Sequence, residues 1–170
     1  MTTFRLLQPG YHASPHISEY VEFTESMFSV SLYVSRHSVP VICAMNGHTF
    51  AAGFNLAMAC DYRVMKTSKA WASMNEIQFG ATAPRSFAAL FTAKAANANI
   101  VRKIWLEGHR WTAQELEKEG LVDQLVEGDT EKVLEAAQAL GNKLAPFART
   151  GVYGLQKVRL WAAYRRLGWG

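Results

Sequence analysis

Apolar residues recur near the start of the chain at steps of three or four positions, along one face. The members of this stripe are Tyr20, Phe23, Met27, Val30 and Val34. A period of this kind predicts an amphipathic helix. Pro15 suits the first turn of that helix, and Pro40 prevents its continuation because proline lacks a backbone N–H.

The middle of the chain alternates short apolar runs with turn residues. Residues 41–45 are continuously apolar and include β-branched members, which predicts a buried strand. Residues 53–59 are apolar nearly all round, as in a buried helix. Two further strands are predicted at residues 61–65 and 70–74.

Helical patterns dominate the second half. They predict helices at residues 84–96 and 97–107, and then a short helix that opens with a capping box at Thr112 and ends at Gly120. Residues 121–126 read as a strand. The chain is therefore predicted to be a mixed α/β protein, and no internal repeat is visible in it.

Residues 128–170 continue this helical character. A stripe at helical spacing consists of Val133, Ala137, Leu140 and Leu144. A final helix is predicted after Gly151. All charged residues after Glu135 are basic: Lys143, Arg149, Lys157, Arg159, Arg165 and Arg166. Such a segment can contact phosphate or can be an ordinary solvated helix face, and the scattered helical projection of its charges favours the solvated face.

Composition narrows the class of protein. The 170 residues are 49% apolar and 19% charged, as expected for one globular domain. The net charge of +4 suits acidic small molecules as well as nucleic acid. No apolar run has the length of a membrane span, so no membrane contact is expected. Cys43 and Cys60 lie in apolar runs and read as small buried residues, not as a disulfide framework.

The compartment stays open among peroxisome, mitochondrion and cytoplasm. No basic-then-apolar leader precedes the first predicted helix. The chain ends in Leu-Gly-Trp-Gly, which is no Ser-Lys-Leu peroxisomal address.

A loop of small residues before the buried helix is the first candidate for chemistry. At Ala51, Ala52 and Gly53 little side chain stands between a ligand and the backbone. The N–H groups at a helix start are unpaired and carry a partial positive charge, which would stabilise an oxyanion. The alternative is a tight packing turn, and the loop alone favours that alternative.

Glu76 is the second candidate, because it is an acid among apolar neighbours such as Trp71, Met74 and Phe79. It can be a rim residue with its carboxylate in water. It can also be partly buried, and burial would raise its pKa toward the range of a general base. Residue 55, where a second acid could stand, is Asn55.

Five ordered segments resemble the crotonase (enoyl-CoA hydratase/isomerase) superfamily. They are PVICAMNGH at residues 40–48, AAGFNLAMACDYR at 51–63, NEIQFG at 75–80, LEGHRWTA at 106–113 and EGLVD at 119–123. Five segments in one order are far more specific than a lone motif. The resemblance extends over residues 20–165.

The resemblance implies a spiral of ββα units, incomplete at the N-terminus, followed by a C-terminal helical region used in trimer assembly. It divides the chain into an unassigned segment at residues 1–13, a partial crotonase-like core at 14–127 and a helical assembly region at 128–170. It also implies acyl-CoA thioester substrates, no separate cofactor, and a homo-oligomer that is a trimer or a dimer of trimers. Neither a metal nor nucleic acid is expected as a partner.

The family's roles can be carried over to matching positions. One oxyanion donor falls on the Ala52 N–H, with Ala51, Gly53 and Asn55 as the neighbouring substrate-binding positions. Hydratases carry two glutamates, of which the first would stand at position 55 and the second falls on Glu76. One acid and one asparagine make the site resemble the Δ3,Δ2-enoyl-CoA isomerases, since a double-bond shift needs one proton carrier.

The N-terminus departs from the family pattern. The strand whose loop supplies the other oxyanion donor has no counterpart in residues 1–14, so the chain reads as a shortened form. Two other readings stay open beside the isomerase: a non-catalytic fragment that acts through assembly, and a hydratase-like activity.

Overall fold

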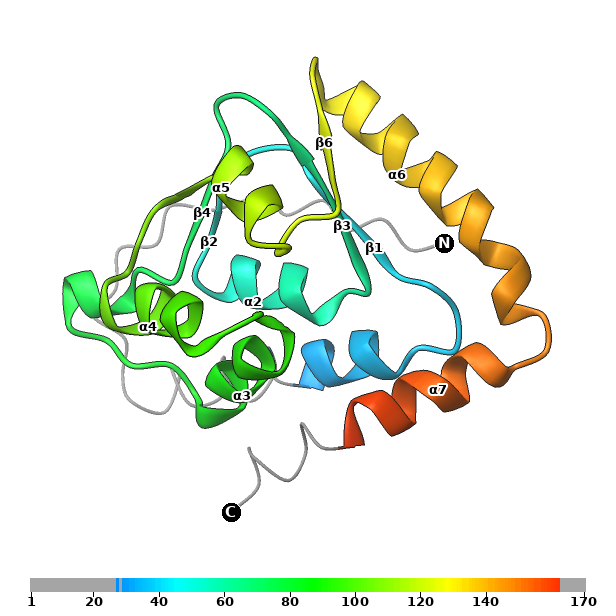
Figure 1. The fold of residues 1–170 in the computed structure, drawn as a ribbon, viewed down its shortest axis with the longest axis horizontal. Helices are drawn as coiled ribbons and strands as arrows, with labels where there is room; N and C mark the ends of the chain where they lie inside the picture. The colour runs from blue at the N-terminus through cyan, green and yellow to red at the C-terminus, as the bar shows by residue number, and fades with distance from the viewer. Residues whose placement is uncertain (1–26, 28, 163–170) are drawn as a thin grey trace.

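Two small sheets form the centre of the computed structural model, which describes residue 27 and residues 29–162 (Figure 1). Sheet A has the order β1-β3-β6 and all its neighbours are parallel. Its strands are β1 at Ile42–Met45, β3 at Tyr62–Lys66 and β6 at Gln124–Val126. Parallel strands require crossover connections, and helices supply them here.

Sheet B has the order β2-β4-β5. Its strands are β2 at Thr49–Phe50, β4 at Trp71–Ser73 and β5 at Trp111–Thr112. β2 and β4 are parallel, whereas β5 runs antiparallel to β4.

Two consecutive ββα units supply two of the three strands of each sheet. The first is β1-β2-α2, with α2 at Ala52–Ala59, and the second is β3-β4-α3, with α3 at Arg85–Lys94. A 3-10 turn, η1 at Glu76–Phe79, precedes α3 in the second unit. Each unit gives its first strand to sheet A and its second strand to sheet B. This repeat of topology confirms the predicted ββα architecture, although the sequence shows no matching repeat.

Helices make up most of the remaining chain. They are α4 at Ala98–Leu106, α5 at Ala113–Lys118, α6 at Thr130–Leu144, η2 at Ala145–Ala148 and α7 at Val152–Leu160. The four α-helices were expected from the helical patterns, whereas the 3-10 helix η2, which contains Pro146, was not predicted. The predicted capping box is present at the start of α5, where the Thr112 and Glu115 side chains bond each other's backbone N–H groups.

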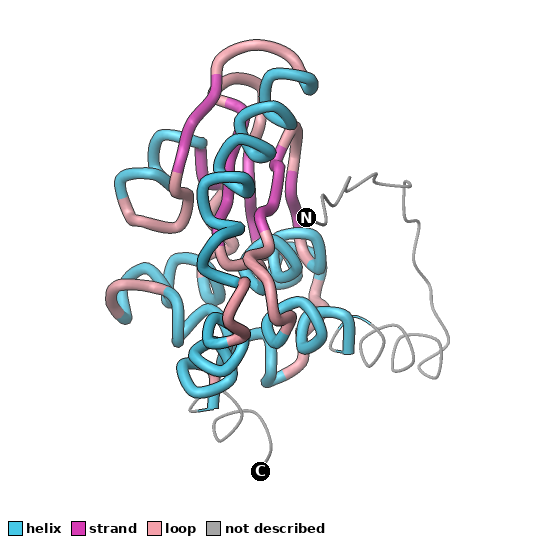
Figure 2. Tube along the Cα trace, turned by 90° about the vertical axis from the view of Figure 1, so that its right-hand side faces the viewer, coloured by secondary structure: helices cyan, strands magenta, loops and turns pink. Residues whose placement is uncertain are grey.

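Sheet A is covered on both faces, which explains its continuous apolar runs. On one face Ile42, Ala44 and Val64 pack against Val133 and Ala137 of α6. On the other face, Cys43, Met45 and Met65 pack in the main core with residues of α2 and α3. In Figure 2 α6 lies in front of the strands, along their length.

The first predicted helix is described only in part, since residues 1–26 and 28 lie outside the described residues. Residue 27 and residues 29–36 are helical. This segment lies beside α7 (Figure 1): Lys157 Nζ donates to the Val34 carbonyl at 3.2 Å, and a Cβ on Gly154 would come within 2.9 Å of Ser38 Cα. In the described part of the chain no helix is long and apolar enough to cross a membrane.

The structure differs from the sequence-based expectation at two strands. β2 and β5 have two residues each and were not predicted. Two residues are too few to show an alternating pattern, so only pairing with β4 defines these strands.

Candidate functional site

The register of sheet B brings the small-residue loop and the Glu76 segment to the same edge. β2 and β4 are parallel, and Phe50 stands opposite Ser73. The chain therefore leaves β2 into Ala51 and leaves β4 toward Glu76 from neighbouring carboxyl ends. The Ala51 N–H donates to the Ser73 carbonyl at 2.8 Å and ties the two exits together.

The loop at Ala51 has a strained backbone that opens α2. Ala51 has φ 52° and ψ −126°, a conformation that side-chain-bearing residues rarely adopt. Its carbonyl accepts from the Phe54 and Asn55 N–H groups at 2.9 and 3.1 Å, which starts the helix. Ala52 and Gly53 occupy the first two helical positions, where a backbone N–H has no intrahelical acceptor. No hydrogen bond from either N–H to another described residue is present.

This arrangement leaves two adjacent N–H groups for a ligand. Both belong to partly exposed residues, and no side-chain oxygen caps the helix. Such donors can hold an anionic oxygen. The predicted role of the Ala52 N–H is compatible with this geometry and stays a prediction.

Glu76 lies in a setting that suits a proton carrier. It is the first residue of η1, three positions after β4 ends. Its Oε2 atom is buried and has no hydrogen-bond partner within the described residues. Burial raises the pKa of the Glu76 carboxyl, and a hydrogen bond from its own backbone N–H partly opposes this effect. A raised pKa brings a carboxyl closer to the range in which a group serves as a general acid and base.

The turn that carries Glu76 is held by the loop after α4. The Gly108 carbonyl accepts from Gln78 Nε2 and from Ser73 Oγ, both at 3.0 Å. Gly108 has φ +56°, and a Cβ there would meet Ile77 Cγ2 at 3.1 Å. The sequence marked Gly108 only as a helix end, because its contact with η1 crosses 30 residues.

Asn55 points into the core. It is fully buried, and its Nδ2 donates to Ser31 Oγ at 2.9 Å, on the helix at residues 29–36. Its Oδ1 is buried without a hydrogen-bond partner among the described residues. An amide cannot take up a proton as a carboxylate does. The predicted contact between Asn55 and substrate stays a prediction.

A second polar cluster, which the sequence did not predict, lies at the other end of α2. Asp61 Oδ2 accepts from the Val41 N–H and from Lys157 Nζ, both at 2.8 Å. The expected solvated position of Lys157 is wrong, because this side chain is only 5% exposed. Arg63 is also buried, and it pairs with Asp123 at 3.2 Å. The Arg63 guanidinium further donates to the carbonyls of Leu121 and Cys60.

A pocket of about 700 Å³ opens beside this second cluster, between α3 and α7. None of the five predicted site residues lines it. Its charged lining comes from Asp61, Arg63 and Lys157 of the cluster and from Lys94.

Within the described residues, no group of three or more His, Cys, Asp or Glu side chains lies close enough together to hold a metal ion. Cys43 and Cys60 are free and buried, as the sequence predicted. Trp111 is 2% exposed and packs in the core.

Comparison of the sequence with known proteins identifies a family. The family model described as "Enoyl-CoA hydratase/isomerase" matches residues 7–159. Enoyl-CoA delta isomerase 3 of Arabidopsis thaliana is 34% identical over 107 residues, which cover 63% of this chain and 45% of that protein. The probable enoyl-CoA hydratase EchA12 of Mycobacterium tuberculosis is 32% identical over 154 residues, covering 87% of this chain and 53% of the relative. The chain thus spans about half the length of these relatives.

Solved structures give the same fold. A probable enoyl-CoA hydratase/isomerase from Mycobacterium abscessus is 31% identical, with a TM-score of 0.74 over 88% of this chain and 56% of that one. A family protein from Pseudomonas syringae superposes with a TM-score of 0.82 over 91% of this chain and 65% of that one. Its identity of 18% supports the fold alone. The predicted crotonase-like architecture is confirmed.

Proposed function

Because the chain belongs to the enoyl-CoA hydratase/isomerase (crotonase) family, we propose that it shifts the double bond of a 3-enoyl-CoA to the 2-trans position. This reaction is a step of fatty-acid β-oxidation. The observation that carries the proposal is Glu76, whose Oε2 atom is buried and has no hydrogen-bond partner within the described residues.

The proposed reaction needs one proton carrier and one oxyanion site. The Glu76 carboxylate takes a proton from C2 of the substrate, and the electron pair moves toward the thioester oxygen. The Ala52 N–H stabilises the resulting dienolate. Glu76 then returns the proton to C4, and the double bond lies between C2 and C3. A positioned acid/base contributes roughly 10²–10⁴-fold to a rate, and one oxyanion donor about 3 kcal/mol.

Asn55 supports isomerisation over hydration. Addition of water requires a base that activates the water and an acid that protonates carbon, and two carboxylates share these tasks in hydratases. At position 55 this chain has an amide whose Nδ2 already donates to Ser31. The names of the relatives include both delta isomerases and hydratases, and the amide at position 55 supports the isomerase.

The remaining parts of the site are also proposals. Ala51 and Gly53 would line the approach of the thioester to the Ala52 N–H, and Asn55 would lie beneath it. A second oxyanion donor would come from outside the described residues. Coenzyme A would be bound as the carrier of the substrate.

The proposal is tested by assaying the 170-residue chain for 3-enoyl-CoA isomerisation and for hydration of 2-enoyl-CoA under the same conditions. We expect isomerisation to exceed hydration. Hydration without isomerisation would overturn the proposal, and the absence of both activities in a folded chain would also count against it.

A second candidate function is assembly without catalysis, and exposed apolar side chains favour it. Large apolar side chains on η2 and α7 are exposed: Phe147, Val152, Leu155 and Leu160. Contiguous exposed apolar residues mark interaction surfaces. Light scattering over a concentration series tests this candidate. A chain that stays monomeric throughout excludes self-assembly, and Leu155→Gln should weaken any oligomer that forms.

A further inference from the structure

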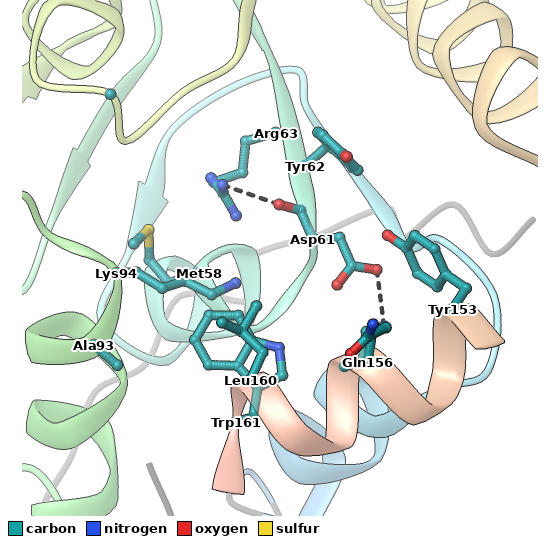
Figure 3. Close-up of a pocket in the computed structure, with 12 residues that line it drawn as sticks. Met58, Asp61, Tyr62, Arg63, Ala93, Lys94, Tyr153, Gln156, Leu160 and Trp161 are labelled. Carbon is teal, nitrogen blue, oxygen red and sulfur yellow. Dashed lines mark hydrogen bonds and ion pairs between the residues drawn. The ribbon is translucent and has the colours of Figure 1, made fainter. Parts of the chain in front are cut away.

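Lys94 is placed in the pocket between α3 and α7 in a way that the proposed reaction does not use (Figure 3). It is the last residue of α3 and only partly exposed. Its Nζ donates to the Cys60 carbonyl at the end of α2 and lies 4.6 Å from the centroid of the Trp161 ring. The amine is therefore held in one place at a pocket wall.

Other charged groups around the pocket are already paired with each other. Asp61 pairs with Lys157 at 2.8 Å, and Arg63 pairs with Asp123 at 3.2 Å. Within the described residues Lys94 has no carboxylate partner. Three basic side chains, Lys94, Lys157 and Arg63, thus lie near two carboxylates. Each carboxylate is already paired with Lys157 or Arg63, and Lys94 is the third cation.

This environment favours the neutral amine. Burial is the largest cause that lowers the pKa of Lys94, and together with the nearby positive charges of Arg63 and Lys157 it brings this pKa to about 7. Asp61 and Cys60 act in the opposite direction without reversing the effect. A neutral amine is a nucleophile, whereas an ammonium group is not.

We propose that Lys94 is a site of N-acylation by acyl thioesters that enter this pocket. The Nζ lone pair attacks the thioester carbonyl carbon, and a C–N bond forms. The C–S bond breaks, the sulfur leaves with the electron pair, and the proton lost by nitrogen passes to the thiolate. The products are an amide and a free thiol, and no oxidant or metal is needed. The inference rests on the proposed function only for the class of acyl donor.

The structure also makes the product at Lys94 tolerable. An acylated lysine is neutral, and at this position no carboxylate loses its partner. The same reaction at Lys157 would leave Asp61 buried without its cation. The pocket wall beside Lys94 is apolar at Met58, Leu160 and Trp161, which suits an acyl group.

Acetyl-CoA is the probe, and the 170-residue chain is its own control. Acetylation of each lysine is measured by mass spectrometry of peptides over time at pH 7.5. We expect Lys94 to react at least roughly tenfold faster than the exposed Lys69 and Lys118, because a larger share of its amine is neutral. A rate at Lys94 equal to or below theirs overturns the proposal.

The pH dependence of the acetylation rate distinguishes an amine with a lowered pKa from an amine that is merely accessible. The Lys94 rate should be half-maximal near pH 7 and level off above pH 8, while the rates at the exposed lysines keep rising. In urea-unfolded chain this difference should vanish. A Lys94 profile that rises in parallel with Lys69 in the folded chain contradicts the inference.

Two variants complete the test. Lys94→Arg should abolish labelling of that peptide and leave isomerisation unchanged. Glu76→Gln should reduce isomerisation by roughly 10²–10⁴-fold and leave the Lys94 label in place, so that failure of one proposal can be told from failure of the other. Loss of the label in a folded Glu76→Gln variant would count against an independent reaction at Lys94.

Discussion

Lys157 of α7 and Asp61 at the entrance to β3 form an ion pair with a 2.8 Å Nζ–Oδ2 distance across 96 residues of sequence. The two side chains are only 5% and 9% exposed. The same Asp61 oxygen accepts the N–H of Val41, just before β1. One carboxylate therefore joins sheet A to α7.

Asp61→Asn should destabilise the chain by about 3–5 kcal/mol, because it leaves the buried Lys157 ammonium without a counter-charge. The amide oxygen can still accept the Val41 N–H, so the loss reports the charge. Urea unfolding measures it. The double variant Asp61→Asn, Lys157→Met should recover part of the stability.

The exposed pair between Arg102 and Glu107 is the matched control. Glu107→Gln should cost less than about 1 kcal/mol, since solvent screens exposed ion pairs. Equal losses for Asp61→Asn and Glu107→Gln would mean that the Asp61 pair is not enclosed as the structure has it.

Glu76→Gln should reduce isomerisation by roughly 10²–10⁴-fold, because the amide cannot carry a proton. Steady-state kinetics with a 3-enoyl-CoA measures the change. Glu117→Gln, at an exposed position of α5, is the control and should keep full activity. Residual activity of Glu76→Gln close to that of the parent chain would remove Glu76 from the mechanism.

The same Glu76 variant should alter stability in a pH-dependent way. The carboxyl has a raised pKa in the folded chain because of burial, so folding favours its protonated form. Its contribution to stability is therefore fully present below the unfolded-state pKa and is lost as the pH rises through the folded-state pKa. Glu76→Gln should be more stable than the parent chain at pH 8 and indistinguishable from it at pH 3.5.

Thermal unfolding at the two pH values measures this difference. Glu117→Gln again serves as the control, because its exposed side chain is not desolvated. An advantage of Glu76→Gln that is larger at pH 3.5 than at pH 8 would have the wrong sign and refute the assignment.

Gly108→Ala should lower both stability and activity. Its φ of +56° costs an alanine about 1–2 kcal/mol. The new Cβ would also press on Ile77 at 3.1 Å and displace η1, which carries Glu76.

Gly120→Ala is the matched control for this effect. Gly120 has φ +70°, but nothing lies within 4 Å of its Cβ position. It should lose similar stability from backbone strain and keep its activity. Circular dichroism melting and the isomerisation assay separate the two effects. Equal activities of the two variants would show that the Gly108 contact does not position Glu76.

Local pattern was enough to predict most helices and the strands of sheet A. The continuous apolar run at residues 41–45 and the helical stripe through Val133 are each visible within a short segment, and the capping box at Thr112 is complete within four residues. The five ordered segments identified the family for the same reason, since each is contiguous. Glu76 stood out because its neighbours in sequence are apolar.

Only the tertiary structure decided where those pieces meet. The two-residue strand β2 exists because β4 pairs with it, and that pairing brings Ala51 to Ser73 and toward Glu76. Lys157 sits among basic residues of a helix that reads as solvated, yet its ammonium reaches Asp61. Contacts between residues far apart in sequence depend on the path of the whole chain, and a charge or a two-residue strand carries no periodic signal of its partner.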